Sequence, residues 1–134
     1  MKKLHSILLI DDDQATNFIH KFILEKEQCA ENIICKQSGQ DALKYLTTQV
    51  NNDYPHPDII FLDINMPGMN GWEFIEEYKK IDIKQKCNKI VVMLSTSSNP
   101  LDKEKANAID QINRFISKPL TAEVIEAIIK ENFH

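Results

Sequence analysis

Short, continuously apolar segments recur along this chain and are separated by amphipathic ones. Ile7–Ile10, Ile59–Leu62 and Ile90–Leu94 have the uniform apolar character of strands that are buried on both faces. Ile33–Cys35 with its flanks is shorter and suits the edge of a sheet. Phe115–Ile116 is a short fifth run. The pattern therefore predicts five strands.

Each predicted strand is followed by apolar residues at helical spacing. After the first strand, Asp13 can cap a helix that runs from Gln14 to about Glu27. Its apolar positions are Ala15, Phe18, Ile19, Phe22 and Ile23. The second and third helices are expected from Ser38–Gly39 through Leu46 and from about Trp72 to Lys80. A fourth is expected after Asn99–Pro100, and its inner face would carry Leu101, Ala106 and Ile109. The last is expected after Thr121, and its apolar stripe is Val124, Ile125, Ile128 and Ile129. Asn51–Pro57 and Ile81–Asn88 are expected to be loops.

Strands that alternate with helices predict an α/β fold in which a doubly wound parallel sheet is covered by helices on both faces. Right-handed crossovers leave few arrangements of such a sheet. All strand carboxyl ends then lie at one edge, which is where open α/β folds bind ligands. The residues that directly follow each strand therefore become the candidates for a functional site.

Four of the predicted strands end in residues that carry a charge or a hydroxyl group. Asp11 and Asp12 come after the first strand, Asp63 after the third, Ser95 after the fourth and Lys118 after the fifth. In a parallel sheet these five side chains converge at one edge. An isolated acid at a strand end most often only begins a turn, so the set, and no single member, indicates a site.

Three carboxylates at one site repel each other and must share a proton or hold a cation. The candidate ligands are oxygen atoms and neither His nor Cys joins them, so Mg²⁺ fits better than a softer metal. Lys118 and a hydroxyl on the opposite side would donate hydrogen bonds to a phosphoryl group held there. A carboxylate can itself be the nucleophile, and Asp63, at the centre of the edge, is the candidate for an aspartyl phosphate.

The composition narrows the class of protein and its partners. A chain of 134 residues with 43% hydrophobic and 27% charged residues fits a single globular domain. No segment is long and apolar enough to cross a membrane, and the apolar run near the N-terminus is too short for a signal peptide. The formal net charge of -4 argues against a nucleic-acid surface. Protein partners are expected instead. The three cysteines, Cys29, Cys35 and Cys87, lack metal-ligand spacing, so free thiols in a reducing cytoplasm are expected.

Four separated motifs now carry a resemblance to a known family. They are Ile-Leu-Leu-Ile-Asp-Asp-Asp, Asp-Ile-Asn-Met-Pro-Gly-Met-Asn-Gly, Met-Leu-Ser-Thr-Ser and Ser-Lys-Pro-Leu, in that order along nearly the whole chain. Together they resemble the receiver domain of bacterial two-component response regulators, of the stand-alone type that chemotaxis regulators represent. The resemblance implies a flavodoxin-like fold of five parallel strands in the order 2-1-3-4-5 with five helices.

The resemblance also implies roles for the acidic residues. Asp63 resembles the phosphoacceptor, and Asp11 and Asp12 resemble the acidic pair that holds Mg²⁺. Asn65 matches the position whose backbone carbonyl completes the metal shell. Three consecutive aspartates leave the register open, but counting from the end of the first strand favours Asp11 and Asp12 as ligands and Asp13 as the helix cap.

The remaining motif residues are expected to hold the phosphoryl group and to transmit its presence. Ser95 resembles the hydroxyl residue that grips a phosphoryl oxygen, with Thr96 as the second candidate. Lys118 resembles the lysine that pairs with the phosphoryl group, and the Lys118–Pro119 bond is expected to be cis. Phe115 matches a switch aromatic that turns inward when Ser95 is drawn toward the phosphoryl group. The alternative for Phe115 is a core aromatic that does not move.

The whole chain, residues 1–134, is therefore expected to be one receiver domain without an output domain. A phosphohistidine on a sensor histidine kinase or a histidine phosphotransfer protein would donate the phosphoryl group, and slow self-hydrolysis would end the signal, so no other enzymatic activity is expected. The signal would leave by protein contact, through the face of the fourth helix, fifth strand and fifth helix, or pass along a phosphorelay. The target is unidentified, and the domain would be a monomer or a phosphorylation-dependent dimer.

Two other functions deserve comparison. A haloacid-dehalogenase-like phosphatase also uses an aspartyl phosphate and Mg²⁺, but it needs a second acid two residues after the nucleophile, where this chain has Asn65. A pseudo-receiver would keep the acids only for structure. The presence of all five polar residues at the strand ends argues against that second alternative.

Overall fold

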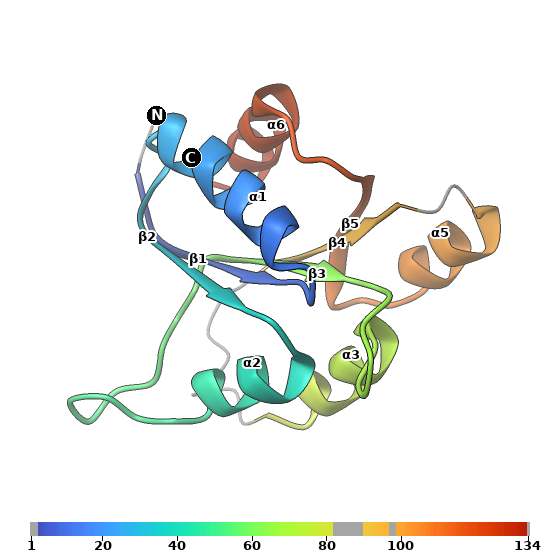
Figure 1. The fold of residues 1–134 in the computed structure, drawn as a ribbon, viewed down its shortest axis with the longest axis horizontal. Helices are drawn as coiled ribbons and strands as arrows, with labels where there is room; N and C mark the ends of the chain where they lie inside the picture. The colour runs from blue at the N-terminus through green and yellow to red at the C-terminus, as the bar shows by residue number, and fades with distance from the viewer. Residues whose placement is uncertain (1–2, 82–89, 97–98, 134) are drawn as a thin grey trace.

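The computed structural model describes residues 3–81, 90–96 and 99–133. Within them, strands and helices alternate along the chain. The elements, labelled as in Figure 1, are β1 (Leu4–Ile10), α1 (Gln14–Lys26), β2 (Ala30–Lys36), α2 (Gly39–Leu46), β3 (Ile59–Asp63), α3 (Gly71–Lys79), β4 (Ile90–Ser95), α5 (Pro100–Asn107), β5 (Ile112–Ser117) and α6 (Ala122–Asn132). Most of the predicted loop Ile81–Asn88, Cys87 and Ser97–Ser98 lie outside the described residues.

The five strands form one parallel sheet in the order β2-β1-β3-β4-β5. This is the predicted flavodoxin-like order. The central strands are in continuous register, with Ile7 beside Ile59 and Ile59 beside Ile90. The two weaker predicted strands, β2 and β5, are the edges of the sheet, and both are longer than their apolar runs. Parallel pairing therefore places every strand's carboxyl end at one edge.

Helices cover both faces of the sheet (Figure 1). Helices α1 and α6 lie together on one face, and α2 and α3 lie together on the other. Successive residues of a strand point to opposite faces, so β1 buries Leu8 and Ile10 against α2 and α3, and Ile7 and Leu9 against α1 and α6. The continuous apolar runs of the central strands reflect this two-sided burial.

Helix α1 has the predicted position and cap, but it buries a different face from the one its apolar pattern indicates. The side chains of Phe18, Ile19 and Phe22 are 71%, 50% and 58% exposed. The residues that α1 buries are Asn17, His20 and Leu24. The physical reason is hydrogen bonding. The side chains of Asn17 and His20 form hydrogen bonds with backbone groups of neighbouring segments, so these two residues must face inward.

Helix α5 differs from the prediction in a similar way. Ala106 is buried and Ile109 is half-buried just beyond the end of the helix, but Leu101 is 69% exposed. Residues five positions apart on an α-helix point about 140° away from each other. Because Ala106 faces the core, Leu101 faces solvent, and its predicted inward position is wrong.

Three further expectations from the sequence concern a peptide bond, the cysteines and membrane-spanning helices. The Lys118–Pro119 peptide bond is cis, as expected. Cys29 and Cys35 carry free thiols, as expected for the described part of the chain. Among the described helices, none has the length and apolar character that a membrane crossing requires.

Candidate functional site

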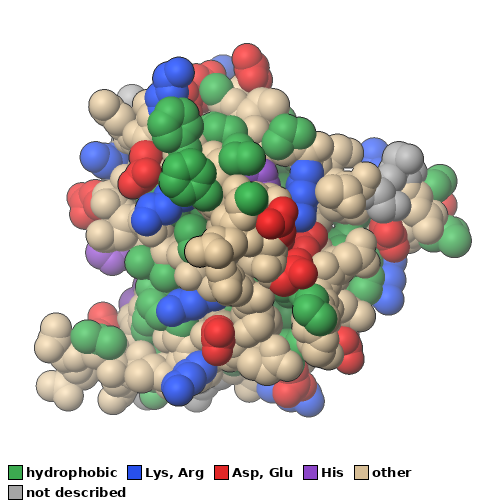
Figure 2. Space-filling view, viewed as in Figure 1, with side chains coloured by type: hydrophobic (Ala, Val, Ile, Leu, Met, Phe, Trp, Pro, Cys, Tyr) green, Lys and Arg blue, Asp and Glu red, His purple; other side chains and the backbone are tan. Residues whose placement is uncertain are grey.

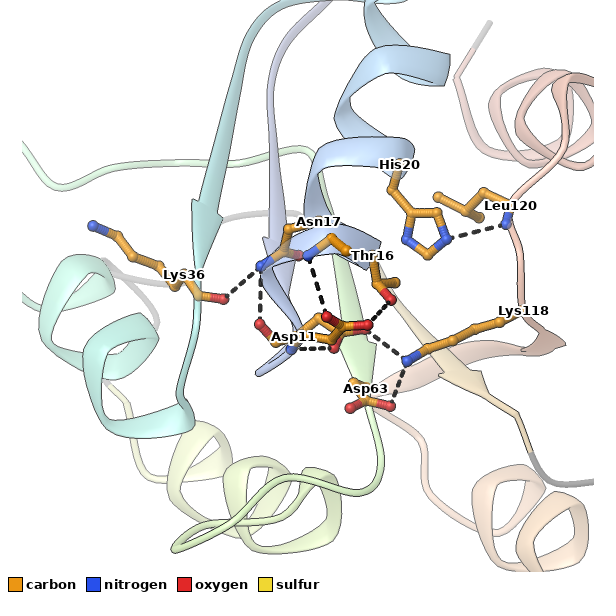
Figure 3. Close-up of polar contacts among 10 residues, drawn as sticks. Asp11, Thr16, Asn17, His20, Lys36, Asp63, Lys118 and Leu120 are labelled. Atoms are coloured by element: carbon orange, nitrogen blue, oxygen red, sulfur yellow. Dashed lines mark hydrogen bonds and ion pairs between the residues drawn. The ribbon is translucent and has the colours of Figure 1, made fainter.

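The candidate site lies at the carboxyl edge of the sheet, where the parallel strands end side by side. Asp11 follows β1 directly, Asp63 is the last residue of β3, and Lys118 follows β5. Figure 3 shows the side chains of these three residues pointing toward one another. Although Asp11 and Lys118 are 107 positions apart, Lys118 Nζ lies 2.6 Å from Asp11 Oδ2 and 2.9 Å from Asp63 Oδ1. The predicted convergence is confirmed for these groups.

Asp12 completes an acidic cluster with Asp11 and Asp63. One carboxylate oxygen from each of the three lies within 4.8 Å of the others. Asp11 and Asp63 are buried, whereas Asp12 is exposed. The cluster can therefore hold a cation that reaches it from solvent. Its donors are all carboxylate oxygens, which suits a hard divalent cation and not a soft metal.

Asp13 has the separate role that the strand register predicted for it. Its carboxylate accepts hydrogen bonds from Ala15 N at 3.2 Å and from the Thr16 hydroxyl at 2.7 Å, so it is the N-cap of α1. The Asp13 N–H donates to Asp11 Oδ1 at 2.9 Å. The cap therefore also orients Asp11, and the expected cap role of Asp13 is confirmed.

Burial and charge shift the ionisation of the central pair. Burial raises the pKa of the Asp63 carboxyl, the hydrogen bond from Lys118 opposes that rise, and the negative charge of Asp11 adds to it. Burial alone lowers the pKa of the Lys118 ammonium, but the hydrogen bonds to Asp11 and Asp63 outweigh it and the pKa is raised. Lys118 thus remains a cation, while burial disfavours the ionised form of Asp63.

The other predicted site residues occupy neighbouring positions. Ser95 ends β4 and is buried, and its carbonyl oxygen accepts the Lys118 N–H at 2.8 Å. Thr96, the alternative hydroxyl, is exposed. Asn65 is exposed in the loop after β3. Phe115 lies within β5 opposite Met93 and is half-buried against the core cluster under α2 and α3.

Residues 7–130 match the response regulator receiver domain. The chain belongs to this family. The match favours a receiver over a haloacid-dehalogenase-like phosphatase, and the acidic cluster with Lys118 lies at the edge where the resemblance placed the receiver's site.

Solved structures agree with this assignment. The receiver domain is 37% identical to a two-component response regulator from Cytophaga hutchinsonii, with a TM-score of 0.83 and 97% of both chains covered. It is 26% identical to a response regulator receiver protein from Dyadobacter fermentans, with a TM-score of 0.84 and coverage of 96% of this chain and 98% of that one. Both neighbours are therefore similar over their whole length.

A curated relative shows the receiver domain within a much larger protein. It is hybrid signal transduction histidine kinase L from Dictyostelium discoideum, which is 28% identical over 131 residues. The match covers 97% of this chain but only 7% of the relative. The similarity therefore concerns one domain of that kinase.

Sequence reasoning missed two polar residues that support the receiver site. Asn17 Nδ2 donates to the carbonyl oxygen of Asp11 at 2.9 Å, and His20 Nε2 accepts the N–H of Leu120 at 3.3 Å (Figure 3). Both side chains are almost completely buried, with 4% and 2% exposed. The available signal was their spacing of three residues on α1, which places both on the same helix face.

The raised pKa of Asp63 predicts that the site costs the receiver domain stability. The pKa of the Asp63 carboxyl is higher in the folded state than in the unfolded state. Its contribution to stability is therefore fully present below the unfolded-state pKa and is lost as the pH rises through the folded-state pKa. Without metal at neutral pH, we therefore expect Asp63→Asn to increase the free energy of unfolding, measured by urea denaturation with a chelator present. The increase should shrink at mildly acidic pH. A variant less stable than the wild type at neutral pH would contradict this prediction.

Proposed function

We propose that this receiver domain accepts a phosphoryl group from a phosphohistidine onto Asp63 and signals in the phosphorylated state. The observation that carries the proposal is the buried Asp63 carboxylate, which lies within one acidic cluster and within 2.9 Å of Lys118 Nζ. A nucleophile, neighbouring metal ligands and a cation for the phosphoryl oxygens are the parts that phosphoryl transfer requires.

In the proposed reaction, one Asp63 oxygen attacks phosphorus as the phosphorus–nitrogen bond to the donor histidine breaks. The electron pair of that bond stays on the imidazole nitrogen, which takes up a proton. Lys118 then passes from the Asp63 carboxylate to a phosphoryl oxygen, and the Ser95 hydroxyl donates to another. Water later attacks phosphorus as the bond between phosphorus and the Asp63 oxygen breaks, which regenerates the carboxylate and releases inorganic phosphate. The domain thus catalyses only its own phosphorylation and dephosphorylation.

Mg²⁺ is the proposed cofactor. Asp11, Asp12, Asp63 and the backbone carbonyl of Asn65 would hold it, and when bound it would neutralise negative charge on the transferring group. The all-oxygen donor set and the exposed position of Asp12 support this choice. Incorporation of one phosphoryl group from acetyl phosphate, dependent on Mg²⁺ and detected by intact mass, tests the proposed function.

We further propose that this receiver domain, matched over residues 7–130, acts in the cytoplasm. The signal then leaves through contact with another protein or passes along a phosphorelay, as a monomer or a phosphorylation-dependent dimer. The output surface is the face formed by α5, β5 and α6. Phe115 is its proposed switch residue, because it lies in β5 only two positions before Ser117, which pairs with Ser95.

The phosphodonor needs a surface beside the site, and α1 supplies one. Phe18, Ile19 and Phe22 are large, exposed apolar residues of this helix, and Figure 2 shows hydrophobic side chains gathered over it. Ile19 also lines a hollow of about 250 Å³ together with Lys118 and Pro119. An apolar face that continues to the reactive group suits a protein partner that delivers its phosphohistidine there.

Replacing Phe18 and Phe22 together by Ser should slow transfer from a phosphorylated histidine phosphotransfer domain by about tenfold or more, since truncating an aromatic hot spot of an interface costs about 2 kcal/mol or more. Labelling by acetyl phosphate should stay unchanged, because the small donor needs no docking surface. Val50→Ser is the matched control, being 64% exposed in the loop between α2 and β3. Equal slowing with both donors would show that the substitutions disturb the site and not docking.

A further inference from the structure

Lys118 has a long side chain, so the place of its ammonium depends on how its backbone is held. On one side the support is clear, because the Lys118 N–H donates to the carbonyl oxygen of Ser95 at 2.8 Å. This bond ties the end of β5 to the end of β4. A second support is needed on the other side, where the chain leaves the sheet toward α6.

His20 provides that second support from α1. Its Nε2 atom accepts the N–H of Leu120 at 3.3 Å, across 100 positions of the chain. Figure 3 shows the imidazole of His20 between α1 and the segment that carries Lys118 and Leu120. Leu120 itself is 1% exposed and packs in the core cluster under α1 and α6. The segment from Lys118 to Leu120 is thus held at both ends, by the hydrogen bond to Ser95 at one end and by the hydrogen bond to His20 at the other.

The environment of His20 keeps its ring in the form that can accept this bond. Burial lowers the pKa of His20, the negative charge of Asp11 opposes that shift, and the positive charge of Lys118 reinforces it. The neutral ring has a lone pair on one nitrogen, which here is Nε2 because that atom faces the Leu120 N–H.

We propose that His20 is a positioning residue for phosphoryl transfer, because its hydrogen bond to Leu120 fixes the backbone from which Lys118 reaches Asp11 and Asp63. The inference rests on the function proposed above for Lys118. A residue that only filled space at this point of α1 would be apolar, as Leu24 is one turn later. An acceptor is required instead, since the buried Leu120 N–H otherwise loses its partner and the segment shifts to find another.

Two substitutions separate the hydrogen bond from packing. His20→Leu keeps an apolar side chain of similar size and removes the acceptor. His20→Gln keeps a side-chain oxygen that can accept the Leu120 N–H. Urea denaturation and circular dichroism establish that each variant is folded before its chemistry is compared with that of the wild type.

The first readout is the rate of labelling by acetyl phosphate at saturating Mg²⁺, followed by intact mass over time courses long enough to include slow variants. His20→Leu should label about tenfold more slowly, because a small misplacement of a charge-stabilising group costs at least that much in rate. His20→Gln should restore most of the rate. In a Lys118→Met background, His20→Leu should have no further effect, since the group through which His20 acts is gone.

The second readout is Mg²⁺ affinity, measured by calorimetry without a phosphodonor. Lys118 and Mg²⁺ compete for the carboxylates of Asp11 and Asp63. A displaced Lys118 competes less well, so His20→Leu should bind Mg²⁺ about threefold more tightly. This increase should be absent in the Lys118→Met background and in His20→Gln.

These outcomes distinguish the inference from the proposed function. If the wild-type protein is neither labelled by acetyl phosphate nor able to bind beryllium fluoride, the proposed function fails, but the calorimetric comparison still tests His20. Equal effects of His20→Leu with and without Lys118 would assign His20 a purely structural role and overturn the inference. Wild-type rates and affinities in His20→Leu would overturn it as well.

Discussion

Asp63→Asn is expected to abolish labelling by acetyl phosphate, whereas the wild-type domain gains one phosphoryl group in the presence of Mg²⁺ and none after chelation. The amide has the same shape as the carboxylate but is a far weaker nucleophile, so the bond to phosphorus does not form. Asp63 is buried beside Lys118, and the Asn side chain has the same size and shape, so the surrounding packing stays intact. Intact mass spectrometry measures the result directly.

Asp13→Asn is the matched control for this experiment. It makes the same chemical change close to the acidic cluster, but Asp13 caps α1 and Asn is an equally good cap. The control should therefore be labelled like the wild type. Labelling of Asp63→Asn at the wild-type rate would place the phosphoryl group elsewhere.

If the wild-type protein gains no phosphoryl group, two explanations remain: a pseudo-receiver, or hydrolysis too fast to observe. In that case, addition of beryllium fluoride, a stable mimic of the phosphoryl group, distinguishes a site that cannot bind the group from one that hydrolyses it too fast to observe. Binding of the mimic by the wild type but not by Asp63→Asn would indicate fast hydrolysis. Absence of binding would contradict the proposed function.

Gly71→Ala is expected to lower the free energy of unfolding by about 3 kcal/mol, the upper range for forcing an extra methyl group into a packed interior. A Cβ atom at Gly71 would lie 2.7 Å from the carbonyl oxygen of Asp63 and 2.9 Å from the Cα atom of Ile64. Both are backbone atoms, and the Gly71 N–H is bonded to the Ile64 carbonyl at 2.7 Å. The strand end that carries Asp63, the proposed phosphoacceptor, must therefore shift.

The comparison for Gly71→Ala is Gly39→Ala, measured by the same urea denaturation. A Cβ atom at Gly39 would also meet a neighbour at 2.7 Å, but that neighbour is the sulfur of the flexible Met69 side chain. We expect a loss below about 1 kcal/mol there, because the side chain can move and Ala favours a helix over Gly. Equal losses for the two variants would mean that the backbone around Asp63 yields as easily as a side chain. The labelling rate should fall only in Gly71→Ala.

The exposed aromatic residues of α1 connect the fold to its proposed use. Burying Phe18 and Phe22 would stabilise the isolated domain, yet α1 turns Asn17 and His20 inward instead. That arrangement supports the backbone of Asp11 and Leu120 and leaves an apolar face beside the site. In the proposed function, the inner face of α1 thus supports the chemistry and its outer face offers a surface to a partner.

Local patterns along the chain were sufficient for the fold and for most of the site. Uniform apolar runs such as Ile59–Leu62 identify strands buried on both faces, and their alternation with helices requires a parallel sheet. A parallel sheet brings all strand ends to one edge, so Asp11, Asp63 and Lys118 could be grouped before any distance was known. The family motifs then supplied the strand order.

The orientation of α1 was decided only by the tertiary structure. The apolar pattern of α1 identifies a helix correctly, but the face that is buried depends on which groups lie opposite. Those groups are the Asp11 carbonyl and the Leu120 N–H, and the second of them is 100 positions away from His20. Because a buried backbone group must find a hydrogen-bond partner, this distant requirement outweighed the local preference of Phe18 and Phe22 for the interior.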